Sequence, residues 1–172
     1  MSKKIYFTTT EIIPFANVSN VAAFSTAVPT LMQELGHDIR TILPKYGFIS
    51  ERKYILREVI RLREIPFKFG KENVITSAKS AFIPKTRVQV YFLEDTKRFK
   101  PLTNLIYKAK NGRVISDIHE RFALFSKASL GDNKSGSISS RYSIVAILQG
   151  LKFSCPVFWI DSISVLSFPW GI

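Results

Sequence analysis

The sequence has a single cysteine, Cys155, and only two histidines, His37 and His119. One cysteine cannot form an intramolecular disulfide, and a Cys-rich zinc site needs about four nitrogen or sulfur ligands. We therefore expect no disulfide framework and no metal site, and we interpret both histidines as structural. The sequence also lacks Walker, G-x-G-x-x-G, G-x-S-x-G and H-E-x-x-H motifs. It thus carries none of the usual signatures of P-loop NTPases, dinucleotide-binding folds, serine hydrolases or zinc proteases.

Long uncharged apolar runs are missing as well. No segment continues for the roughly 18 residues of a membrane-spanning helix without a charged residue or a proline. At the N-terminus, Glu11 and Pro14 follow the first apolar residues too soon for a secretory signal. The sequence therefore predicts a cytoplasmic protein with no membrane contact.

What the sequence does contain is typical of a folded domain with a basic region. Of its 172 residues, 46% are hydrophobic and 22% are charged, which fits one globular domain. The net charge is +12, and residues 52–113 hold 16 lysines and arginines against five acidic residues. Such a region attracts nucleic acid, nucleotide sugars or acidic surfaces, or is a solvated basic face without a ligand. The absence of RNA-binding and zinc-finger motifs argues against nucleic acid.

The first 43 residues have the pattern of a strand–helix–strand unit. Residues 4–8 and 37–43 are short apolar runs that predict strands. Between them, apolar residues recur at a helical period over 21–35, and Ser19 or Asn20 is placed to cap that helix. A unit of this kind has parallel strands with a right-handed crossover. We expect an α/β fold with a mostly parallel sheet and helices on both faces.

Further along the chain the pattern is mixed. Residues 74–82 and 87–93 predict strands, and a helix is expected from about Asp117. The stretch 50–69 fits either a helix or a strand.

The composition changes after Leu130. Residues 131–137 read as a linker, and the rest is serine-rich and apolar with almost no charge. We therefore divide the chain into a domain over 1–130 and a linker with an apolar tail of unknown origin over 131–172. We expect this tail to be irregular and poorly packed, with aromatic residues that promote aggregation: Phe153, Phe158, Trp159 and Phe168.

Four stretches carry a family resemblance. A strand followed by TEIIPFA, and a helix ending in LMQELGHDIRTILPKYG, resemble the N-terminal start of bacterial glycogen synthases and plant starch synthases. VQVYFLED and DIHERFALFSKASL resemble later stretches of the same domain, in the same order. The resemblance covers residues 4–130. It implies the N-terminal half of a GT-B glycosyltransferase, which has two Rossmann-like domains.

The resemblance also implies a reaction and its substrates. Members of this family transfer glucose from ADP-glucose to the non-reducing end of an α-1,4-glucan with retention of configuration, and they need no metal or cofactor. The N-terminal domain mainly receives the glucan, and the C-terminal domain holds most of the nucleotide sugar. The partners implied for this chain are therefore α-1,4-glucan and ADP-glucose.

The chain departs from the family at the loop after the first strand. Where the family has K-T-G-G-L-A-D, this sequence has Asn17 for the lysine, Ser19 and Asn20 for the glycines, and Ala23 for the aspartate. The lysine and the glycines serve the phosphates of the sugar nucleotide, by charge and by close approach of backbone N–H groups. The resemblance thus places a degenerate phosphate-binding loop at Asn17, Ser19 and Asn20.

Two carboxylates are candidates for the acceptor side. Glu11 follows the first strand, and ligands of open α/β sheets bind beyond the carboxyl ends of the strands; the alternative is a solvated loop carboxylate. Asp117 is what remains of the family's Y-P-D-N before E-R-F. We assign no catalytic residue.

Three hypotheses for function follow. In the first, the chain is a truncated and inactive glycogen or starch synthase domain, because the family's second Rossmann domain has no counterpart in these 172 residues. In the second, it is a non-catalytic module that binds glucan or a protein partner. In the third, it is a basic nucleic-acid-binding protein unrelated to sugars.

Overall fold

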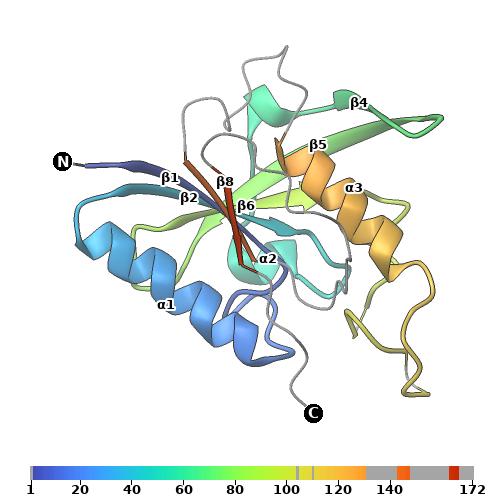
Figure 1. Ribbon diagram of the computed structural model, residues 1–172, viewed down its shortest axis with the longest axis horizontal. Coiled ribbons are helices and arrows are strands. Elements are labelled where there is room, and N and C mark those ends of the chain that lie inside the picture. The colour runs from blue at the N-terminus through green and yellow to red at the C-terminus, as the bar shows by residue number, and fades with distance from the viewer. Residues whose placement is uncertain (1, 104, 110, 131–142, 148–162, 167–172) are drawn as a thin grey trace.

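The computed structural model describes residues 2–103, 105–109, 111–130, 143–147 and 163–166 (Figure 1). Its strands form one sheet. They are β1 (Lys4–Thr9), β2 (Asp38–Pro44), β3 (Arg57–Glu58), β4 (Ile65–Phe69), β5 (Glu72–Phe82), β6 (Gln89–Glu94), β7 (Ser143–Ile147) and β8 (Ile163–Leu166). The order across the sheet is β3-β5-β6-β2-β1-β7-β8, and β4 pairs with β5 beside β3.

The centre of the sheet is parallel and one edge is antiparallel. β1 lies between β2 and β7, β6 follows β2, and β8 follows β7, all in parallel. β5 runs antiparallel to β6, β3 and β4. The predicted parallel pairing of the first two strands is confirmed, with Phe7 opposite Thr41. The fold is a mixed α/β fold with an open, mostly parallel sheet.

The helices are α1 (Asn20–Glu34), the short α2 (Glu51–Tyr54), the 3₁₀ helix η1 (Ile60–Leu62) and α3 (Ile118–Leu130). α1 begins where Ser19 caps it, because the Ser19 side chain accepts a hydrogen bond from the Val21 N–H. It ends before Gly36, whose φ of +83° suits a glycine. No helix of the described residues is long and apolar enough to cross a bilayer.

α1 and α3 are both linked to residues at the carboxyl end of β1. The Thr9 hydroxyl is hydrogen-bonded to that of Ser25 in α1 at 2.8 Å. The Thr10 hydroxyl is hydrogen-bonded to that of Tyr107, whose ring lies 5.9 Å from Phe122 in α3. Both helices are thus anchored at the end of β1.

The core is rich in aromatic side chains that are almost fully buried. Phe15 packs edge-on against Phe92 in β6 with ring centroids 4.9 Å apart, and Phe99 packs edge-on against Phe125 in α3 at 6.3 Å. Large buried aromatic rings contribute much apolar area, and edge-on pairs add a further favourable term. These contacts join β6 and the loop that follows it to α3 and to the loop after β1.

Two expectations need correction. The stretch 50–69 is neither one helix nor one strand, since it contains α2, β3, η1 and β4 in turn. The segment after residue 130 is not irregular throughout, because β7 and β8 extend the parallel sheet on the open side of β1. The expected exposure of Phe153, Phe158, Trp159 and Phe168 lies outside the described residues.

Candidate functional site

Polar residues follow the carboxyl ends of three neighbouring parallel strands. Thr10 and Glu11 follow β1, Lys45 follows β2, and Asp95 follows β6. The carboxyl ends of parallel strands share one edge of the sheet, and open α/β sheets bind ligands at this edge. These four residues therefore mark the candidate site, and their hydrogen bonds and ion pairs are described in turn below.

Glu11 is fully buried and is held by the loop between β1 and α1. Its Oε2 accepts hydrogen bonds from the backbone N–H groups of Val18 and Ser19 at 2.9 and 2.8 Å. Its Oε1 accepts a hydrogen bond from the Ser19 hydroxyl at 2.9 Å. The N-terminus of a helix favours an anion through its exposed N–H groups and its dipole. In this chain the carboxylate of Glu11 itself fills that role, so it is not a solvated loop carboxylate.

The three predicted phosphate-loop residues lie together on this loop. Ser19 is half-buried and bonded to Glu11, whereas Asn17 and Asn20 are exposed. The loop is narrow, since Ile12 and Ala16 exchange two backbone hydrogen bonds of 3.0 and 2.8 Å. Asn17 and Asn20 therefore present their side chains to the solvent, whereas the Ser19 hydroxyl is bonded to Glu11.

Two buried tyrosines contact Thr10, at the start of the loop between β1 and α1. The Tyr46 hydroxyl donates a hydrogen bond to the Thr10 carbonyl at 2.8 Å, and the Tyr107 hydroxyl lies 2.8 Å from that of Thr10. Burial, with the negative charge of Glu11 as a further cause, raises the pKa of Tyr107 and that of Tyr46. Both phenols therefore stay neutral. Sequence analysis did not indicate this role: Tyr46 lies in the matching stretch LMQELGHDIRTILPKYG without a predicted function, and Tyr107 lies in an irregular stretch.

Two lysines and two glutamates form a group of ion pairs at the ends of β2 and β6. The Lys45 and Lys79 ammonium groups each lie 2.8 Å from the Glu51 carboxylate in α2. Both also approach Glu94, at 3.4 and 3.5 Å. The hydrogen bonds from Lys45 and Lys79 lower the pKa of Glu51 from 4.5 to about 2. Lys45 is thus engaged with carboxylates of the protein.

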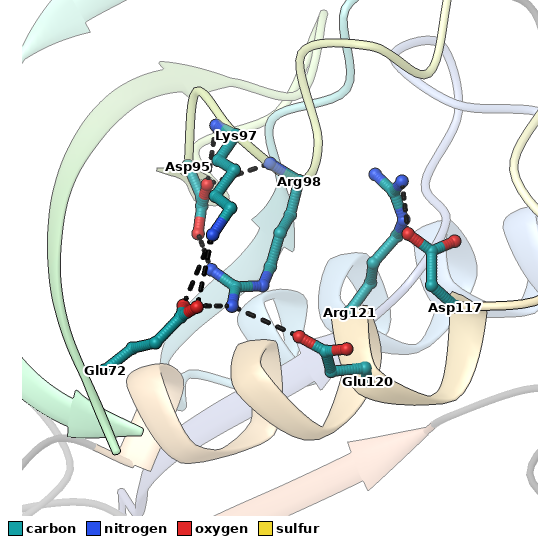
Figure 2. A network of polar contacts seen from close by, with 7 residues as sticks. All are labelled: Glu72, Asp95, Lys97, Arg98, Asp117, Glu120 and Arg121. Atoms are coloured by element: carbon teal, nitrogen blue, oxygen red, sulfur yellow. Dashed lines mark hydrogen bonds and ion pairs between the residues drawn. The ribbon is translucent and has the colours of Figure 1, made fainter. Parts of the chain in front are cut away.

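A second charged group lies around Arg98, whose side chain is only 8% exposed. Figure 2 shows its guanidinium between Asp95, Glu72 and Glu120. Nη2 lies 2.8 Å from Glu72 and 3.2 Å from Glu120, and the Asp95 carboxylate also accepts a hydrogen bond from the backbone N–H of Arg98. Arg98 thereby ties β5 and the end of β6 to α3.

Asp117, the second acceptor-side candidate, is bound to Arg121 in the first turn of α3 (Figure 2). Arg121 Nη2 donates a hydrogen bond of 2.6 Å to the Asp117 carboxylate, and this bond lowers the pKa of Asp117. Arg121 Nε and Nη1 are buried without a hydrogen-bond partner in the described part of the chain. Asp117 and Glu11 share no direct contact there, but Tyr107 links their surroundings by contacting Thr10 and Phe122.

None of these groups forms a metal site in the part of the chain that the structure describes. No three His, Cys, Asp or Glu side chains come together there in a way that could hold a metal ion. The chemistry that the arrangement offers is hydrogen bonding and charge pairing within the protein.

Replacing Glu11 by glutamine tests its contacts with the loop. A glutamine side chain is nearly isosteric but loses the charge-assisted hydrogen bonds, so we expect the free energy of unfolding of the Glu11→Gln variant to fall by about 1.5–3 kcal/mol. Urea denaturation measures this difference. The exposed Asn17→Ala change serves as the control and should remain within about 0.5 kcal/mol of the wild type. Equal stability of Glu11→Gln and wild type would contradict the assignment.

The lowered pKa of Glu51 predicts a pH dependence. Because the pKa is lower in the folded chain, ionised Glu51 stabilises the fold above pH 4.5, and this contribution is lost as the pH falls towards 2. Solvent screening limits it to about 1 kcal/mol. Urea denaturation should show Glu51→Gln less stable than wild type at pH 7 and equal to it near pH 2. Glu58→Gln, at an exposed strand position, should follow the wild type throughout; a pH-independent deficit of Glu51→Gln would refute the explanation.

Comparison with known proteins identifies the family. The model of the starch synthase catalytic domain matches residues 4–138, which extends past Leu130. Glycogen synthase of Chlorobaculum tepidum is 31% identical over 134 residues, which are 78% of this chain and 23% of that protein. Glycogen synthase of Chlorobaculum parvum is 34% identical over 97 residues, which are 56% of this chain and 20% of that protein. The chain thus spans between a fifth and a quarter of the length of these relatives.

A solved structure agrees in fold. The catalytic domain of starch synthase IV from Arabidopsis thaliana, bound to ADP and acarbose, superposes with a TM-score of 0.69 at 18% identity. The match covers 97% of this chain and 34% of the plant chain. The sheet is thus that of a GT-B glycosyltransferase catalytic domain. With a family model that covers most of its length, the chain belongs to the starch synthase catalytic domain family and is a glycogen/starch synthase-like domain.

Proposed function

We propose that this chain is an acceptor-side domain for α-1,4-glucan that does not itself transfer glucose from ADP-glucose. The observation that carries the proposal is the occupied loop between β1 and α1. The N–H groups of Val18 and Ser19 are bonded to Glu11, at the place where the family resemblance puts the donor phosphates.

The charge around the loop supports this proposal. No lysine or arginine occurs between Ile5 and Ile39, although the chain as a whole carries a charge of +12. A diphosphate near the loop would meet the negative charge of Glu11 and no cation of the loop or of α1. Charge-assisted contacts are the strong hydrogen bonds of phosphate sites, and like charges at short range repel.

The acceptor is different in kind. An α-glucan is uncharged and is recognised by hydroxyl hydrogen bonds and apolar contacts, so the loss of a cationic loop does not affect it. Family membership supports a glucan as the ligand class. The plant relative of similar fold was solved with acarbose and ADP bound.

The first test is transfer. The purified 172-residue chain, given radiolabelled ADP-glucose and glycogen, should incorporate no more glucose than a reaction without protein. The triple variant Asn17→Lys, Ser19→Gly and Asn20→Gly should be equally inactive, because Glu11 still occupies the loop and the chain spans about a fifth of the length of its relatives. Incorporation by either chain above the control would overturn the proposal.

The second test is glucan binding. In native gels cast with glycogen, the chain should migrate more slowly than in gels without polysaccharide, and its mobility should be unchanged by dextran, which has α-1,6 linkages. The Glu11→Gln chain should be retarded like the wild type, since Glu11 is buried and cannot touch the polymer. Unchanged mobility in glycogen would refute the acceptor-side role and leave the transfer result standing.

A further inference from the structure

The segment 52–63 carries basic and exposed apolar side chains that are not part of the candidate site. It contains four arginines and one lysine against one carboxylate, Glu58. It covers the end of α2, β3 and η1. β3 is the last strand of the sheet on its antiparallel side and pairs only with β5 in the described sheet. In Figure 1 the segment starts at α2, near the loop that precedes α1, and leads to the side of the sheet where β4 and β5 lie.

Two isoleucines of the segment point into solvent. The exposed fractions of Ile55 and Ile60 are 71% and 86%. Arg57 and Arg61, close to them in sequence, are exposed as well, and neither has an ion pair within the described residues. The nearby carboxylate of Glu51 is already bonded to Lys45 and Lys79. Arg63 lies 3.7 Å from the Glu64 carboxylate, whereas the charges of Arg57 and Arg61 are without an ion pair among the described residues.

The backbone of the segment is fixed at both ends. Ile55 and Glu64 have a φ of +51°, a left-handed conformation that is strained for residues with a side chain. Backbone hydrogen bonds hold the intervening chain: Val59 N–H donates to the Ala78 carbonyl at 3.1 Å, and Glu64 N–H donates to the Ser77 hydroxyl at 3.0 Å. A surface that is already ordered loses little conformational entropy on binding.

We propose that Ile55, Arg57, Ile60 and Arg61 form a docking surface, here called the edge surface, for an acidic segment of a partner protein that also carries apolar side chains. The chemistry follows from charge complementarity. Arginine binds carboxylates with two parallel hydrogen bonds, and it is enriched at protein interfaces, where lysine is depleted. The isoleucines supply the apolar contacts between the charged pairs.

A protein partner explains these features better than nucleic acid or glucan. Single-stranded nucleic acid is bound by exposed aromatic rings on which bases stack. The one aromatic residue of the segment, Tyr54, is half-buried, with its ring 4.8 Å from that of Phe15 and its hydroxyl bonded to the Pro14 carbonyl. An uncharged glucan gives the arginines no partner. The proposal does not depend on the function proposed above.

The test measures the anisotropy of a short fluorescein-labelled peptide of glutamate and aspartate with interspersed leucine. The full chain should bind this peptide more tightly than an all-glutamate peptide of equal length or a labelled oligo-dT. The double change Arg57→Glu with Arg61→Glu should weaken binding about tenfold or more. Ile60→Ser, at a position that is mostly exposed, should weaken it about threefold or more.

A matched control separates this surface from general attraction to a basic protein. Lys100→Glu with Arg113→Glu makes the same change of charge at exposed positions of the loop between β6 and α3. It should weaken binding less than about threefold, and thermal melts should show that all variants are folded. The proposal is overturned if the peptide does not bind, if oligo-dT binds as tightly, if the control weakens binding as much, or if Ile60→Ser has no effect.

Discussion

A buried carboxylate needs hydrogen-bond donors from the protein. For Glu11 these donors are the backbone N–H groups of Val18 and Ser19 and the Ser19 hydroxyl, all in the loop between β1 and α1. This requirement fixes where the chain turns after β1 and where α1 begins, since Ser19 both binds Glu11 and caps the helix. Burial is the main cause that raises the pKa of Tyr46 and Tyr107, and the charge of Glu11 adds to it. The loop after β1 and the start of α1 are therefore arranged around one buried carboxylate.

The remaining charges are organised in closed groups. Arg98 binds three carboxylates, and Lys45 and Lys79 share Glu51 and Glu94, so several cations of the basic region serve the fold rather than a ligand. The cations of the edge surface stand apart from these groups. This surface and the loop after β1 are close in structure, because Tyr54 contacts Pro14 and Phe15. A partner bound at the edge surface therefore lies near the loop after β1.

The strand–helix–strand unit could be predicted because its signals are local: a helical period, a capping serine and a glycine at the end. The family could be recognised from short matching stretches. The burial of Glu11 could not, since it depends on how the loop closes over the carboxylate. The division of 50–69 into four elements could not be predicted either, because β3 and β4 depend on pairing with β5. The positions of β7 and β8 could not be predicted because they depend on the open side of β1. Interactions between distant segments decide each of these features.

Charge is distributed unevenly over the described part of the molecule. α1 lies in a stretch with no lysine or arginine from Ile5 to Ile39, whereas β4, β5 and the turn between them carry Lys68, Lys71 and Lys79 and lie away from α1 (Figure 1). On a negatively charged support the molecules adsorb by their basic side and share one orientation. α1 then lies on the side away from the support, so a simple cation exchanger orients the domain without chemical coupling.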